Sequence, residues 1–288
     1  MTDALTQSSW LLPFFALLLG LTVGSFLNVV IYRLPIMMEA RWRRDCCELL
    51  EIEGEKQEAP LNLATPNSHC PHCKAPVKAW QNIPVVSYLL LGGKCGNCGV
   101  GIAKRYPIIE LITGLMTMAL TWYFGLGMAL GGAIILTWAL VTLTMIDVNH
   151  QLLPDDITLP LMWLGLALNI QGTFVSLQDA VIGAIAGYLS LWVVYWAFKL
   201  ITGKEGMGYG DFKLLAALGA WLGWQMLPVI ILLSSVVGAV VGIALMVLKQ
   251  RGREVPIPFG PYLAAAGWIA LLWGQDIVDR YLSVSGAA

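Results

Sequence analysis

The chain has 288 residues, of which 58% are hydrophobic and only 12% are charged. A soluble domain carries about a quarter charged residues, so the composition excludes an ordinary soluble protein and indicates a polytopic protein of the lipid bilayer. The formal net charge of −1 argues against nucleic acid as a partner, because no basic stripe is available to meet phosphates.

Uncharged apolar runs predict the transmembrane helices, each of which needs about 20 apolar residues. The first run is interpreted as a retained span, since no basic segment precedes it. Two later runs are too long for one span each, and each has an interior break, at 124–127 and at 223–228. Splitting both predicts an all-α membrane protein with about eight transmembrane helices, in the runs 10–32, 111–146, 157–178, 180–198, 214–248 and 255–275.

The positions of Lys and Arg predict the orientation, because these residues concentrate in cytoplasmic loops. With the N-terminus outside, the inner loops hold every Lys and Arg of the chain except Arg280. Both termini are therefore expected outside. We expect three parts: a first transmembrane helix in 1–32, a cytoplasmic domain in 33–105 and a larger transmembrane domain in 106–288.

The inner loop contains two Cys-x2-Cys pairs, Cys70 with Cys73 and Cys95 with Cys98, separated by 21 residues. Two such pairs can meet as a tetrahedral thiolate site for zinc. Two disulfides are the alternative, which a reducing cytoplasm disfavours. Four thiolates leave no open position on the ion, so the predicted zinc is structural and the loop is a zinc-bound domain.

The other cysteines and the histidines of this loop have simpler interpretations. Cys46 and Cys47 lie in a charged segment and are interpreted as free thiols on a surface helix. His69 or His72 could replace a zinc ligand, but four cysteines suffice. No H-E-x-x-H motif is present, and no histidine lies in an apolar run to act as a base for Ser25, so zinc-protease and Ser-His chemistry are unsupported.

Carboxylates are the remaining candidates for catalysis. Asp147 ends the third predicted helix and Asp211 begins the sixth, so the topology places both at the inner membrane boundary. Each alone could be a solvated helix-end charge. As a pair they could share a proton, so that one activates water while the other protonates the scissile carbonyl oxygen. Asp155 and Asp156 are interpreted as a cap for the fourth helix.

Glycines precede Asp211 in the segment GKEGMGYGD, at 203–211. Without Cβ atoms, Gly208 and Gly210 would let an extended peptide substrate approach the backbone closely. A flexible loop is the alternative explanation for these glycines.

Several motifs, in their order along the chain, resemble those of the type IV prepilin peptidase family. GMGYGD at 206–211 carries the GxGD motif of intramembrane aspartyl proteases. The others are GSFLNVVIYRLP at 24–35, the two Cys-x2-Cys pairs, IDVNHQLLPD at 146–155 and PFGPYL at 258–263. The resemblance covers nearly the whole chain, from about Gly24 to Gly267.

The resemblance implies a bifunctional enzyme of the bacterial inner membrane. It would remove the leader peptide of type IV prepilins and type II secretion pseudopilins after a glycine at the cytoplasmic face. It would then N-methylate the new N-terminal residue with S-adenosylmethionine. Asp147 and Asp211 would be the catalytic pair, in a transmembrane aspartyl protease domain that spans 106–288. Glu110 matches a family position without an assigned role.

The sequence contains no recognisable motif for binding the methyl donor. No G-x-G-x-x-G follows a predicted strand, so the S-adenosylmethionine site is unassigned, and the loop around 92–94 is where we expect it. A membrane transporter or assembly scaffold with a zinc-stabilised loop is the alternative. A transporter would carry charges within its spans and pseudo-symmetric halves, and a scaffold would not need both Asp147 and Asp211.

Overall fold

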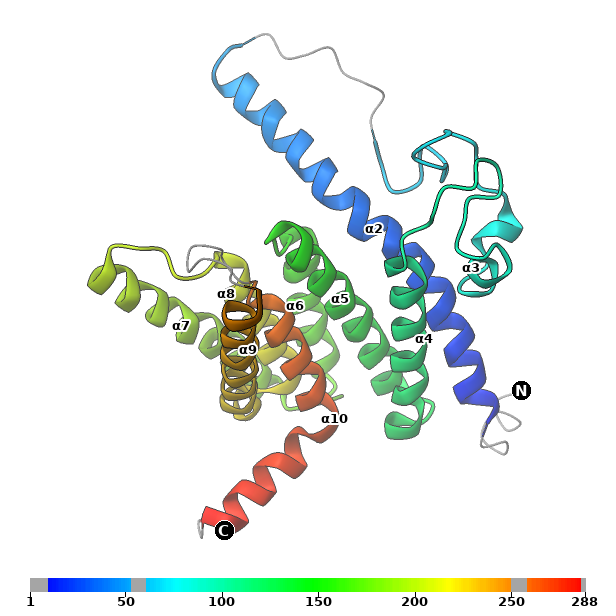
Figure 1. Cartoon of the computed structure of the whole chain (residues 1–288). Helices are drawn as coiled ribbons and strands as arrows, with labels where there is room; N and C mark the ends of the chain where they lie inside the picture. The colour runs from blue at the N-terminus through cyan, green and yellow to red at the C-terminus, as the bar shows by residue number, and fades with distance from the viewer. Residues whose placement is uncertain (1–9, 53–60, 250–257, 286–288) are drawn as a thin grey trace. The chain divides into compact units, whose positions relative to one another are not determined.

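The computed structural model describes residues 10–52, 61–249 and 258–285 (Figure 1). The described residues form helices and no strands. The chain divides into two compact units, an N-terminal unit, Met1–Leu126, and a C-terminal unit, Gly127–Ala288.

The N-terminal unit is built on two long helices that pack against each other, α2 (Leu11–Leu49) and α4 (Arg105–Phe124). The loop between them contains a 3-10 helix, η1 (Ala79–Asn82), and the short helix α3 (Val86–Leu90). Small residues bring the two long helices together: a Cβ added at Gly20 would lie 2.8 Å from the Cα of Gly114. Such close approach is typical of helix pairs in membranes.

Helix α2 does not end where its apolar run ends, at residue 32, but continues to Leu49 (Figure 1). The extension consists largely of good helix formers, and it contains Cys46 and Cys47, as the surface-helix interpretation expected. Arg33 is buried and donates hydrogen bonds to the carbonyls of Asn62, at 2.8 Å, and Pro66, at 2.6 Å. The loop therefore folds back against the point where the apolar run stops.

The C-terminal unit surrounds one short, central helix, α8 (Tyr209–Leu222), in which every residue from Leu214 to Leu222 is buried. At 14 residues it is about 21 Å long, shorter than the hydrocarbon core of a bilayer. A helix that is apolar on all sides is expected to be buried. Helices α6, α7 and α10 pack around it. The other elements are α5 (Met128–His150), α6 (Asp155–Asn169), α7 (Leu177–Thr202), η2 (Trp224–Met226), α9 (Leu227–Lys249) and α10 (Gly260–Ser285).

The predicted number of helices and both predicted breaks are confirmed in the described part of the chain. Eight helices longer than α3 are present. Short segments that are not α-helical separate α4 from α5 and α8 from α9, at the two predicted positions. Gly125 and Gly223 have φ values of 58° and 80° at these breaks, a conformation that favours glycine. Five of the helices are long and apolar enough to cross a membrane, whereas α6 and α8 are shorter than a full span.

Helices α7 and α8 touch through Gly183 and Gly219. A Cβ added at either glycine would overlap the carbonyl oxygen of the other, so both positions require glycine. We expect Gly219→Ala to destabilise the protein by about 1–3 kcal/mol, the usual cost of overpacking. Gly131→Ala on α5 is the matched control, because an added Cβ there meets no atom within 4 Å. Thermal unfolding in detergent measures both, and equal stability of the two variants would contradict the packing argument.

Candidate active site and metal centre

Two buried carboxylates lie at one end of the C-terminal unit. Asp147 is in the last turn of α5 and is 5% exposed, and Asp211 is in the first turn of α8 and is 6% exposed. The side chain of Leu153 lies close both to Gly210, which precedes Asp211, and to Gly260, whose amide binds Asp147. The structure thus brings together, inside a helical bundle, the two carboxylates that the sequence analysis singled out.

The two carboxylates have different hydrogen-bond partners. Oδ2 of Asp147 accepts a hydrogen bond from the backbone amide of Gly260, at 3.0 Å. Oδ1 of Asp211 is buried and has no hydrogen-bond partner among the described residues. A buried oxygen without a donor is costly, so this atom is suited to bind a water molecule or a substrate group.

Leu153, in the turn between α5 and α6, packs against two glycines next to the carboxylates. A Cβ added at Gly210 would lie 2.7 Å from the Cβ of Leu153, and one added at Gly260 would lie 3.1 Å from its Cδ1. Gly210 is therefore required by packing within the protein. Gly208 is different, because an added Cβ there would meet only the Gly210 nitrogen, at 4.0 Å.

The glycine-containing loop before α8 is attached to α7 by polar and aromatic contacts. Glu205 forms an ion pair with Lys199 at 2.8 Å, which holds the pKa of the Glu205 carboxyl below its usual value. Lys199 also donates to the hydroxyl of Tyr195, at 3.2 Å. The Tyr195 ring lies 5.2 Å from the Tyr209 ring, centre to centre. These contacts hold the loop at Glu205 and at Tyr209, on either side of Gly206 and Gly208.

The predicted cap of α6 by Asp155 or Asp156 is wrong. Pro154 occupies the N-cap position, with no side-chain cap, and both aspartates lie in the first helical turn. Asp155 instead forms an ion pair with Lys213 of α8, in which Nζ lies 2.7 Å from both carboxylate oxygens. The pairing joins residues 58 positions apart, which local capping rules cannot detect.

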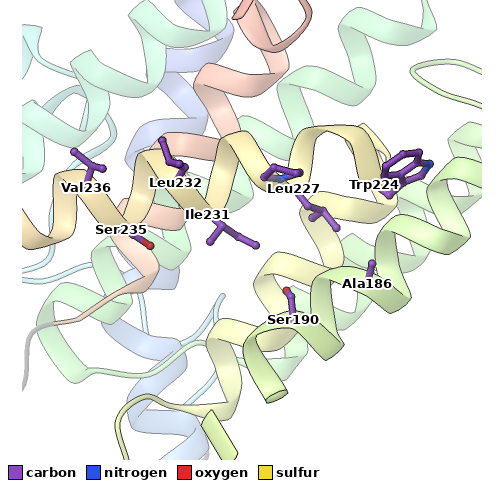
Figure 2. A pocket seen from close by; sticks show the side chains of 9 residues that line it. Ala186, Ser190, Trp224, Leu227, Ile231, Leu232, Ser235 and Val236 are labelled. Atoms are coloured by element: carbon purple, nitrogen blue, oxygen red, sulfur yellow. The ribbon is translucent and has the colours of Figure 1, made fainter. Parts of the chain in front are cut away.

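A groove of about 750 Å³ lies between α7 and α9 (Figure 2), and neither Asp147 nor Asp211 is among the residues that line it. Its lining is almost entirely apolar, as expected for a surface in contact with lipid. Trp224, at one end of it, follows the C-terminal end of α8, whereas Asp211 lies at the N-terminal end of that helix. The groove is lined by Ala186, Ser190, Trp224, Leu227, Pro228, Ile231, Leu232, Ser235 and Val236.

The four predicted zinc ligands meet in the N-terminal unit. The sulfur atoms of Cys70, Cys73, Cys95 and Cys98 all lie within 4.8 Å of one another, and the Sγ atoms of Cys70 and Cys98 are 3.8 Å apart. A tetrahedral ion with Zn–S distances of about 2.3 Å separates its sulfurs by about 3.8 Å. The four thiols therefore fit a metal ion, and none forms a disulfide.

Both Cys-x2-Cys pairs adopt the same turn. In each, the amide of the first cysteine donates to the carbonyl five residues later, at 2.9 Å for Cys70 and 2.8 Å for Cys95. The residue after the second cysteine has positive φ, 58° at Lys74 and 70° at Gly99. The repeated turn points each pair of sulfurs in one direction, toward the other pair.

A neighbouring side chain favours the thiolate of Cys73, and the histidines lie outside the cluster. The side-chain amide of Asn97 lies 3.5 Å from the sulfur of Cys73 and lowers the pKa of that thiol to about 6. A deprotonated sulfur is the form that binds metal. His69 is exposed, with Nδ1 3.0 Å from the carbonyl oxygen of Asn67, and among the described residues the cluster comprises cysteines alone.

Glu110, which the sequence analysis left without a role, connects the cysteine loop to α4. Its buried carboxylate accepts a hydrogen bond from the amide of Val85, at 2.8 Å. Val85 has a φ of 60°, which is costly for a β-branched residue. The hydrogen bond therefore holds a strained turn of the loop against the helix.

Comparison with known proteins gives matches over most of the chain. The bacterial peptidase A24 N-terminal domain matches residues 18–124, and the type IV leader peptidase family matches residues 134–243. A prepilin leader peptidase/N-methyltransferase of Stutzerimonas stutzeri is 58% identical over 93% of this chain and 92% of its own length. Proteins of the same name from Pseudomonas aeruginosa and Aeromonas hydrophila are 57% identical (94% of this chain, 93% of the relative) and 56% identical (95% of each). No solved structure matches the chain.

Proposed function

The chain belongs to the type IV leader peptidase family, and we propose that it removes the leader peptide of type IV prepilins and type II secretion pseudopilins after a glycine. It then methylates the new N-terminal residue with S-adenosylmethionine. Identities above 50% over nearly the full length, to relatives named for both activities, support this function.

Asp147 and Asp211 are the proposed catalytic pair of the peptidase. This assignment rests on the burial of both carboxylates at the same end of the C-terminal unit. In addition, Oδ1 of Asp211 has no hydrogen-bond donor among the described residues. One carboxylate removes a proton from a water molecule, whose oxygen attacks the scissile carbonyl carbon, while the other carboxyl protonates the carbonyl oxygen. The tetrahedral intermediate then collapses, and the leaving amine takes a proton from the pair. Gly208, where an added Cβ would meet only the Gly210 nitrogen at 4.0 Å, is available for the approach of the peptide.

Zn²⁺ is the metal proposed for the four cysteines, in a structural role. Four thiolates fill its tetrahedral coordination and leave no position for substrate. The ion would cross-link the two turns of the loop, and Cys70, Cys73, Cys95 and Cys98 would hold it. The neighbouring turn at Gly92 and Gly93, with φ values of 59° and 69°, is the region proposed for S-adenosylmethionine.

We place the protein in the bacterial inner membrane, because Lys and Arg are concentrated in the predicted inner loops. Both termini are periplasmic in this arrangement. The tetra-cysteine domain, 33–105, faces the cytoplasm, and the protease domain, 106–288, presents Asp147 and Asp211 to the same side. Prepilins would then meet both activities at the cytoplasmic face.

The decisive experiment is incubation of the purified protein with a prepilin in liposomes, with and without S-adenosylmethionine, followed by mass spectrometry. We expect loss of the leader in both reactions and the mass of one added methyl group only when the methyl donor is present. An unchanged substrate mass in both reactions would contradict the proposed enzymatic function and would favour a transporter or an assembly scaffold.

A further inference from the structure

We propose that Gly260, in the PFGPYL motif at the start of α10, is a positioning residue that orients the carboxylate of Asp147. Its backbone amide holds one carboxylate oxygen, and its missing side chain leaves the space that this oxygen occupies. The inference rests on the proposed function, in which Asp147 takes part in peptide hydrolysis. It gives a role to a motif that the catalytic pair and the cysteine cluster leave unused.

The contact between Gly260 and Asp147 leaves no room for a side chain. The hydrogen bond from the Gly260 amide to Oδ2 of Asp147 measures 3.0 Å and is buried. A Cβ added at Gly260 would lie 2.6 Å from the same oxygen, much closer than a van der Waals contact. Any other residue at 260 must therefore displace the carboxylate or the start of α10.

The position of Gly260 in its helix makes its amide available. Gly260 is the first residue of α10, and the first amides of a helix have no partner within that helix. The positive end of the helix dipole adds to the attraction for a carboxylate oxygen. The segment before α10 thus supplies an oriented donor at the C-terminal end of α5.

A second hydrogen bond joins α10 to α5. The indole nitrogen of Trp268 donates to the hydroxyl of Thr137 on α5, at 3.1 Å. The two helices are therefore joined at two levels, one near the catalytic carboxylates and one about two helical turns away. The donor at Gly260 is therefore attached to α5 by two hydrogen bonds, of which one is the bond to Asp147 itself.

The test is the kinetics of prepilin cleavage by Gly260→Ala in the full chain. We expect kcat to fall about 10- to 100-fold, the effect of displacing a catalytic group by up to about 1 Å, while KM changes less than about twofold. Gly267→Ala is the matched control on the same helix, because its added Cβ would meet Leu218 at 2.5 Å. That variant should lose stability but keep the kcat of the folded protein.

Two further variants test whether the effect of Gly260→Ala comes from Asp147 or from Leu153, and whether Asp147 is catalytic at all. Leu153→Ala combined with Gly260→Ala removes the clash with Leu153 but keeps the clash with Asp147, so kcat should stay low. Recovery of kcat in the double variant would overturn the inference and assign the glycine to packing against Leu153. Asp147→Asn separates the two proposals: if it still cleaves, the catalytic pair itself is wrong. If it is inactive while Gly260→Ala retains the wild-type kcat, the positioning role alone is overturned.

Discussion

Replacement of Asp147 or Asp211 by asparagine should lower the kcat of leader cleavage by about a thousandfold or more. Each carboxyl supplies a proton transfer that an amide cannot perform, and such transfers contribute about 10²- to 10⁴-fold each. Methylation of a pilin that has already lost its leader should be retained, because the proposed methylation region lies in the cysteine loop. Mass spectrometry of prepilin and of cleaved pilin measures the two activities separately.

Asp155→Asn is the control for this prediction. Asp155 is a half-exposed carboxylate that pairs with Lys213, and exposed ion pairs contribute at most about 1 kcal/mol. The cleavage rate of this variant should stay within a few-fold of wild type. If a folded Asp147→Asn protein failed both to cleave prepilin and to methylate cleaved pilin, the two reactions would share a site.

Loss of zinc should unfold the cysteine loop. We expect about one zinc ion per chain in the purified protein, and Cys70→Ser combined with Cys98→Ser should release it. Structural zinc sites contribute about 10–16 kcal/mol of binding free energy, which is also folding free energy for the loop. Metal analysis together with limited proteolysis of residues 61–104 measures both effects.

Cys46→Ser with Cys47→Ser is the matched control, because these two thiols lie on α2 outside the cluster. This variant should keep its zinc and its resistance to protease. Full zinc occupancy after the loss of Cys70 and Cys98 would refute the four-cysteine site.

We expect the cysteine loop to depend on the proposed metal, because the loop has almost no core of its own. Between residues 61 and 104, only Cys70 and Ser87 are buried. Segments that cannot bury enough apolar surface usually depend on metals or disulfides for their stability. Arg33 and Glu110 tie the ends of the loop to α2 and α4, and the proposed ion would hold its centre.

Local patterns in the sequence were sufficient for the number of helices, for the two breaks between them and for the choice of candidate residues. Apolar runs and glycine breaks are properties of neighbouring residues, so they predicted the C-terminal end of α4 and the start of α9 closely. The two Cys-x2-Cys pairs likewise carry their own turn geometry. Asp147 and Asp211 could be assigned to the same end of the bundle because successive spans alternate in direction across the membrane.

Only the tertiary structure decided how these groups are held. The hydrogen bond from Gly260 to Asp147 joins residues 113 positions apart. Asp155, which was expected to cap the start of its own helix, forms an ion pair with Lys213 of α8 instead. The role of Glu110 and the continuation of α2 to Leu49 also became evident only in three dimensions. Hydropathy determines which segments enter the membrane, but lateral packing determines which side chains face one another, and single close contacts between helices leave no periodic trace in the sequence.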